Sequence, residues 1–173
     1  MAGAFELDVK QALEDKSAVD IENDHTSSAH LDLFGRDLGE RAITEMWNRR
    51  MELEILEPTA NAFRHRVRLF ANRLRQVPQY AEAQRAVAED HLAWLDHVLA
   101  NRPFIAGDHF SVADITAAAQ LSSLDYLGDV PWDAHEPAKE WYARIKSRPS
   151  FRPILADHLP GLPPPRHYPD LDF

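Results

Sequence analysis

The sequence contains no cysteine and no long apolar segment. Without cysteine, the 173 residues cannot build a disulfide framework, a thiolate metal site or a cysteine nucleophile, which suits a reducing cytoplasm. No run approaches the roughly 18 apolar residues that indicate a membrane span. The opening MAGAFELDVKQALEDK carries acids where a signal peptide has basic residues. We therefore expect a cytoplasmic chain without a membrane anchor.

Basic residues are in deficit, with 19 lysines and arginines against 28 acidic residues and a net charge of -9. Such a charge repels phosphate backbones, so we expect no nucleic-acid partner. The nine histidines include no pair at the four-residue spacing that places two zinc ligands on one helical face. We therefore expect no metal site.

Alternating runs of β-branched and aromatic residues are also missing, so the sequence predicts no sheet. Apolar residues recur instead at helical spacing, as Ile43, Trp47, Met51 and Ile55 show. This pattern predicts a long helix that ends or kinks before Pro58, because the residue before a proline disfavours helical geometry. Further helices are predicted from about Tyr80 to Asn101, from Val112 onward, and through Trp141 and Ile145.

The two ends of the chain lack this periodicity. We expect residues 1–32 to form a poorly ordered arm and residues 33–158 to form one helical domain. Residues 159–173 contain five prolines, which predicts an extended, polyproline-like tail.

The stretch FIAGDHFSVADI contains a helix start. Ser111 precedes the helix, and Asp114 lies three residues later, the spacing of a capping box in which two side chains satisfy otherwise unpaired amides. Ser111 and Asp114 could be mistaken for catalytic partners, but the spacing indicates a structural cap.

With these residues in view, the chain from about Leu33 to Phe151 resembles the all-helical C-terminal domain of the glutathione S-transferase family. The resemblance rests on LFGRDLGERAITEMWNRR, FIAGDHFSVADI and WYARIKSRPSF. It implies an all-α bundle. In that family a thioredoxin-like domain comes first and binds glutathione through an acid–Ser pair. Here the pair would fall on Lys16 and Ser17, so we expect that domain to be absent and Ser17 to be a remnant of its glutathione motif.

The resemblance also implies roles for the first helix of the domain, which in complete transferases lines the pocket for the hydrophobic co-substrate and contacts the partner subunit. Met46, Arg50 and Leu53 are accordingly the candidate ligand-binding groove, whereas Trp47 and Met51 are assigned to packing. Surface that would pack against the missing thioredoxin-like domain should be exposed, and such apolar surface favours self-association or a protein partner.

The final stretch LDYLGDVPWDAHEPAKEWYARIKSRPSFRPILADHLPGLPPPRHYPDLDF resembles alphaproteobacterial members of the family that are associated with cell division. This resemblance implies that the tail serves protein contacts. Tyr168, Leu171 and Phe173 are the candidate partner-binding residues. We therefore expect a non-catalytic helical adaptor without a cofactor. Two alternatives stay open, namely glutathione conjugation, for which glutathione would be the only cofactor, and a carrier of small apolar ligands.

Overall fold

The computed structural model describes residues 33–171, and Ser17 and Phe173 lie outside this range. The described part is helical, with only isolated β-bridges between single residue pairs, which confirms the all-α prediction. The elements, in chain order, are α3 (Leu38–Met51), η1 (Glu52–Leu56), α4 (Glu57–Arg66), η2 (Arg68–Phe70), α5 (Pro78–Leu99), α6 (Val112–Leu127), η3 (Trp132–Ala134), α7 (Glu136–Lys146) and α8 (Arg152–Leu155).

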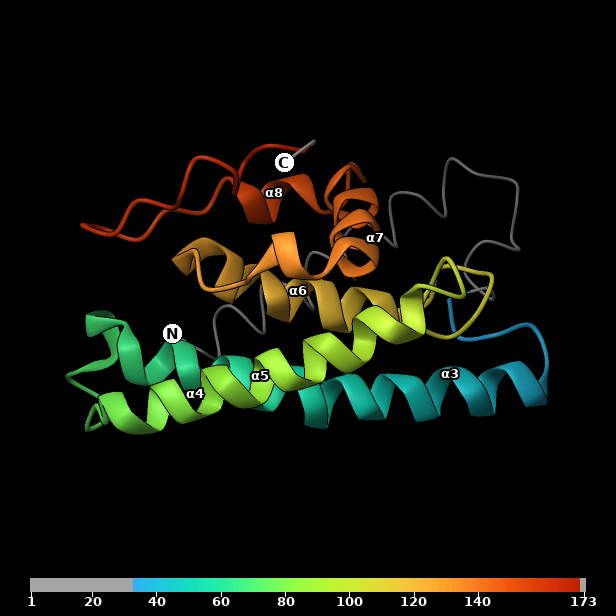
Figure 1. Ribbon diagram of the computed structural model, residues 1–173, viewed down its shortest axis with the longest axis horizontal. Helices are drawn as coiled ribbons and strands as arrows, with labels where there is room; N and C mark the ends of the chain where they lie inside the picture. Colours follow the sequence, from blue (N-terminus) through green and yellow to red (C-terminus); the bar gives the residue numbers. More distant parts are fainter. Residues whose placement is uncertain (1–32, 172–173) are drawn as a thin grey trace, which may run out of the picture.

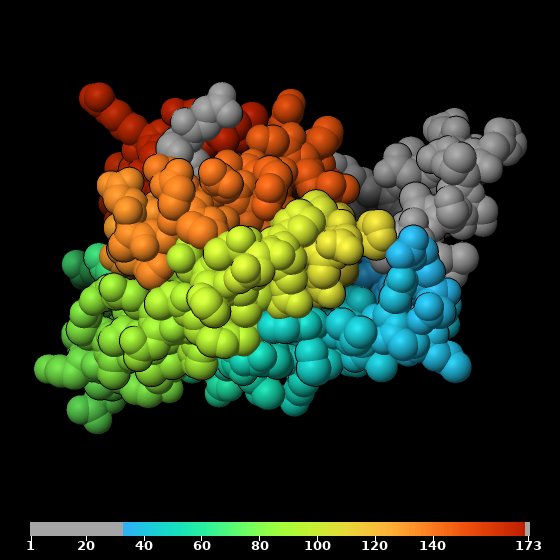
Figure 2. Space-filling view, turned by 45° about the vertical axis from the view of Figure 1, so that its right-hand side comes forward, coloured from blue at the N-terminus to red at the C-terminus, as the bar shows by residue number. Residues whose placement is uncertain are grey.

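Helix α6 forms the middle layer of the described bundle (Figure 1). Helices α3, α4 and α5 lie on one side of α6, and α7, α8 and the tail lie on the other. Figure 2 shows α5 running diagonally across the surface. Helix α6 buries three alanines completely, namely Ala113, Ala117 and Ala118. Their small side chains allow the neighbouring helices to pack close to α6. The capped helix α6 is thus the central element of the described bundle.

The sequence predicted that the first helix ends or kinks before Pro58, and of these two outcomes the end does not occur. The helix continues from α3 through the π-helical segment η1 into α4, which contains Pro58 near its start. In the wider π turn the Glu57 amide bonds the Glu52 carbonyl. The Thr59 hydroxyl donates to the Ile55 carbonyl at 2.7 Å and to the Leu56 carbonyl at 3.0 Å. These bonds satisfy backbone groups near the proline, so the chain stays helical.

The start of α3 is capped by Asp37, whose Oδ1 accepts a hydrogen bond from the Glu40 amide at 2.9 Å. The Glu40 carboxylate instead accepts from the Arg36 amide at 2.8 Å and from the Arg36 guanidinium. The Arg36 hydrogen bonds lower the pKa of Glu40 to about 2.

The tail is not extended polyproline but a series of turns that fold back on the bundle. Leu159 and Leu162 form an isolated bridge, and Tyr168 is only 2% exposed. The tail passes close to Gly128, which ends α6 with a positive φ of 72°, and a Cβ there would lie 3.8 Å from Pro165. Proline fixes local geometry without preventing side chains between the prolines from packing.

No helix within residues 33–171 is both long enough and apolar enough to span a membrane.

Candidate functional site

The predicted ligand groove lies along α3 and η1. Met46 and Leu53 expose 48% and 51% of their surfaces, while Trp47 and Met51 are buried, as their assignment to packing requires. Helical geometry thus separates two apolar sets on one helix, one for the core and one for solvent. The solvent side offers an open apolar surface.

The Arg50 guanidinium is held by contacts within the bundle and does not extend from this surface into solvent. It donates two hydrogen bonds to Glu54, at 2.9 and 3.0 Å, and lies 3.8 Å from the centre of the Trp94 ring. Trp94 in turn stacks on Trp47 with 5.4 Å between ring centroids. Glu54 balances the charge of Arg50, and the guanidinium lies over the Trp94 ring of α5. Arg50 therefore links α3 to α5.

Arg102 contributes a second guanidinium to this cluster, 4.3 Å from the centre of Trp47. Its Nε is buried and finds no hydrogen-bond acceptor within residues 33–171. Burial lowers the pKa of Arg102, an effect that the charge of Asp114 opposes and that of Arg50 reinforces. Sequence reasoning missed this residue, because its partners come from helices distant in the sequence.

The capping box forms as the spacing predicts, and Asp114 is fully buried. One carboxylate oxygen accepts from the Ile105 amide and from Trp141 Nε1, both at 2.9 Å. The other accepts from the Ser111 amide at 2.9 Å and its hydroxyl at 3.1 Å. Burial raises the pKa of Asp114, and the four donated bonds oppose that rise. Asp114 is thus enclosed by structural donors and has no access to a substrate.

The candidate tail residues have separate positions. The Tyr168 hydroxyl lies 2.9 Å from the Ser122 hydroxyl and 3.3 Å from the Ile154 carbonyl, in the core between the tail and α6. Leu171 is partly buried against this core. Tyr168 therefore anchors the tail, and of the described tail candidates only Leu171 has surface available to a partner.

Asp125 holds the same region together, although no sequence motif pointed to it. Its Oδ1 accepts from Trp132 Nε1 at 2.8 Å and lies 3.0 Å from His167 Nε2. The buried Lys146 ammonium lies 3.9 Å from Asp125 Oδ2 and donates to the His167 carbonyl at 3.1 Å. Burial lowers the pKa of Lys146, whereas Asp125 and Asp170 raise it. Through their contacts with His167, Asp125 and Lys146 hold the tail against α6 and α7.

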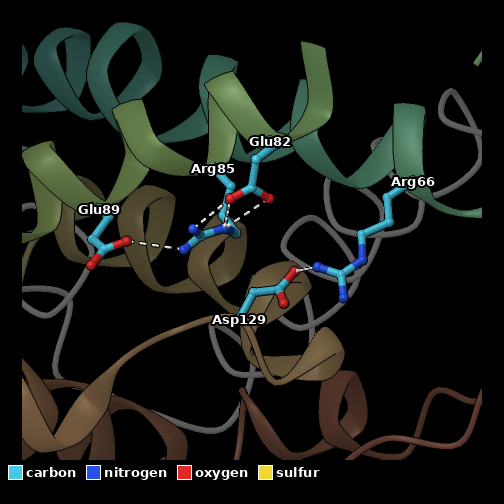
Figure 3. A network of polar contacts seen from close by, with 5 residues as sticks. All are labelled: Arg66, Glu82, Arg85, Glu89 and Asp129. Carbon is cyan, nitrogen blue, oxygen red and sulfur yellow. Dashed lines mark hydrogen bonds and ion pairs between the residues drawn. The ribbon is translucent and has the colours of Figure 1, made fainter. Parts of the chain in front are cut away.

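A cavity of about 330 Å³ lies between the end of α4, the start of α5 and the end of α6. Its charged side chains are paired with one another (Figure 3). Arg66 binds Asp129, and Arg85 lies between Glu82 and Glu89, at 2.7 and 2.9 Å. The charged side chains that line the cavity pair with acidic or basic neighbours, Arg66 with Asp129 and Arg85 with Glu82. None of these four side chains is left unpaired to bind a charged ligand.

Within residues 33–171, no group of three or more histidine, aspartate or glutamate side chains is placed to hold a metal ion.

Comparison with known proteins gives the chain its family. The family model for the C-terminal domain of glutathione S-transferase matches residues 78–144. A glutathione S-transferase structure from Sinorhizobium meliloti is 34% identical, with a TM-score of 0.70, over 84% of this chain and 71% of that one. The chain belongs to the glutathione S-transferase family. The family resemblance expected from the sequence is thereby confirmed.

Two further matches of this glutathione S-transferase family chain carry the names FtsZ-localized protein A and FzlA. FtsZ-localized protein A of Caulobacter vibrioides is 42% identical over 152 residues, which cover 82% of this chain and 63% of that protein. The structure of FzlA from C. crescentus is 36% identical with a TM-score of 0.70, over 88% of this chain and 69% of that one. The chain thus spans somewhat less than two thirds of the curated relative.

Proposed function

We propose that this chain is a non-catalytic helical adaptor that binds a protein. The observation that carries the proposal is the 42% identity to FtsZ-localized protein A over 152 residues. The name of that relative places it with FtsZ, so FtsZ is the partner that we propose for this chain. The folded tail supports the proposal, since a segment held in one position loses little entropy when it binds.

The contact surface in this proposal is the tail beyond its anchor. His167 and Tyr168 are held by Asp125 and Ser122, so they position the residues that follow rather than touching the partner. Leu171, partly buried at the edge of the core, and Phe173 are the proposed contact residues.

The test is co-sedimentation of the purified chain with FtsZ filaments assembled with GTP. We expect the wild-type chain to pellet with the filaments, and Leu171→Glu and Phe173→Glu to reduce the pelleted fraction severalfold. Phe34→Glu is the matched control, because Phe34 is 54% exposed and belongs to the opposite end of the described chain. A wild-type chain that stays in the supernatant, or an equal loss in the control, would contradict the proposal.

Glutathione conjugation is the second candidate, favoured by the 34% identity to a glutathione S-transferase. The exposed Met46 and Leu53, beside Arg50, would then contact a hydrophobic co-substrate, and the same face would serve the carrier alternative. Titration calorimetry with glutathione and a chlorodinitrobenzene assay on the same sample separate the candidates. The adaptor proposal expects neither heat nor turnover, and turnover would replace it with the enzyme.

A further inference from the structure

Acidic residues are absent from one segment of this acidic chain. Between Pro58 and Ala81 the sequence contains no aspartate or glutamate, although the whole chain has 28 of them and a net charge of -9. The same segment contains five arginines and no lysine. The arginines are Arg64, Arg66, Arg68, Arg73 and Arg75.

The five arginines lie together at one end of the molecule. They occupy the end of α4, the short helix η2 and the loop that leads into α5, drawn in green at the left of Figure 1. This segment forms an outer end of the surface, and all five side chains are exposed. We call residues 64–77 the arginine tip.

Pairing separates the arginines of the tip from those of the neighbouring cavity. Arg66 is bound by Asp129, and Arg85 by Glu82 and Glu89 (Figure 3). The other four arginines of the tip make no ion pair with any residue from 33 to 171. Their guanidinium groups are not paired with a carboxylate of this part of the chain. Their hydrogen-bond donors are therefore available for bidentate pairing with the carboxylates of a partner.

The tip has a defined shape before any partner arrives. The Gln76 side-chain amide donates to the carbonyls of Val67 and Arg64, and the Val77 amide donates to His65 Nδ1 at 3.3 Å. Phe63 and Phe70 pack edge to face with 6.0 Å between their centroids. These contacts fix the backbone that carries the arginines, which lowers the entropy lost on binding.

Apolar side chains are interleaved with the charges. Leu69 exposes 42% of its surface and Tyr80 exposes 41%. The first turn of α5 has no acidic residue and no side-chain cap, so the positive end of its helix dipole faces the same region. The surface around the tip therefore combines exposed guanidinium groups with exposed apolar side chains.

We propose that the arginine tip binds an acidic segment of a partner protein, in which carboxylates alternate with apolar residues. The inference deepens the proposed adaptor function and rests on it for the partner being a protein, but it concerns a surface separate from the tail. Nucleic acids and anionic membranes present negative charge over areas wider than the tip. The acidic remainder of the chain would repel such a surface, whereas a short peptide needs to contact only the tip.

The experiment uses the whole chain and a fluorescein-labelled synthetic peptide of alternating glutamate, leucine and glycine, followed by fluorescence anisotropy. The wild-type chain is expected to bind the peptide, with an affinity that falls as NaCl is raised. Arg68→Glu and Arg73→Glu should each lower the affinity about fivefold, since each converts an attraction into a repulsion. Both side chains are exposed and unpaired, so thermal melting should be unchanged.

Arg152→Glu is the matched control, because Arg152 is also exposed, lies in α8 and changes the net charge equally. Absence of peptide binding, or an equal loss in the Arg152→Glu chain, overturns the proposal. Oligothymidylate and vesicles of phosphatidylcholine with phosphatidylglycerol are titrated in parallel. Tighter binding of either one, lost in the Arg68→Glu and Arg73→Glu chains, also overturns it in favour of a nucleic acid or a membrane. Because no FtsZ is present, the result is independent of the co-sedimentation test.

Discussion

Asp114 joins three separate parts of the chain, since it accepts hydrogen bonds from Ile105, Ser111 and Trp141. Replacing it with alanine leaves buried donors without an acceptor, at roughly 1–3 kcal/mol for each group. We expect Asp114→Ala to lower the free energy of unfolding by about 3 kcal/mol or more, measured by urea denaturation. Asp37→Ala, which removes an exposed cap, should cost only about 1 kcal/mol. Equal losses would show that the Asp114 contacts matter only as a local cap.

Tyr168 gives the stability of the chain a dependence on alkaline pH. Burial raises the pKa of its hydroxyl to about 12, from an ordinary value of 10.0. The unfolded chain therefore releases this proton first, and the stabilisation present below pH 10 is lost as the pH rises towards 12. The loss should amount to about 2 kcal/mol for this one group.

Tyr168→Phe isolates this effect. The variant should lose roughly 1 kcal/mol at neutral pH, because the Ser122 hydroxyl loses its partner. Its stability should then fall less steeply than that of the wild type between pH 10 and 12, as followed by denaturation with tryptophan fluorescence. Lys146, whose pKa burial lowers, acts in the opposite direction in both chains, so it cancels in the comparison. Identical slopes would contradict the buried position of the hydroxyl.

At the scale of elements, the π-helical segment η1 allows the helix to pass Pro58. Thr59 is fully buried, and its hydroxyl bonds the carbonyls of Ile55 and Leu56. Thr59→Val keeps the shape but removes the donor, so we expect a loss of about 1–2 kcal/mol. Thr59→Ser retains the hydroxyl and should recover part of that loss. A Thr59→Val chain as stable as the wild type would show that the hydroxyl does not support the π turn.

Local rules explain which elements could be predicted. The helix after Ser111 and the central position of α6 follow from a cap and small residues that lie close together in the sequence. The sequence left open whether the helix ends or kinks before Pro58, since the local preference before proline is overridden by a wide turn and a threonine donor. The folded tail escaped prediction for a similar reason. Its prolines are local signals, but Tyr168 and His167 find their partners on α6, more than forty residues away.

At the scale of the whole molecule, the net charge does not show how the charged residues are distributed along the chain. The net charge of -9 correctly describes the chain as acidic, yet it hides a segment with five arginines and no acid. That signal was present in the sequence as a run, although the absence of ion pairs around Arg64, Arg68, Arg73 and Arg75 required the structure. The Trp47, Arg50 and Arg102 cluster carried no such run, because its members are brought together only by packing of α3 and α5.

Exposed apolar side chains on α3 and η1 lead to a prediction about assembly. Leu38, Ile43, Met46 and Leu53 are all largely exposed, and apolar surface of this kind favours association. We expect the mean mass in light scattering to rise with concentration. The Met46→Glu and Leu53→Glu double variant should remain monomeric over the same range, while Leu69→Glu, on the arginine tip, should behave as the wild type. A monomeric wild-type chain would count against this role of α3.

The stacked indoles of Trp47 and Trp94 have a spectroscopic consequence. Rings with centroids 5.4 Å apart and planes inclined by 23° couple their electronic transitions, so the pair should give an exciton signal in far-ultraviolet circular dichroism. The signal would report the contact between α3 and α5 without any label. Since Arg50 lies over both rings and is next to the exposed face of α3, the protein carries an intrinsic reporter for whatever binds there.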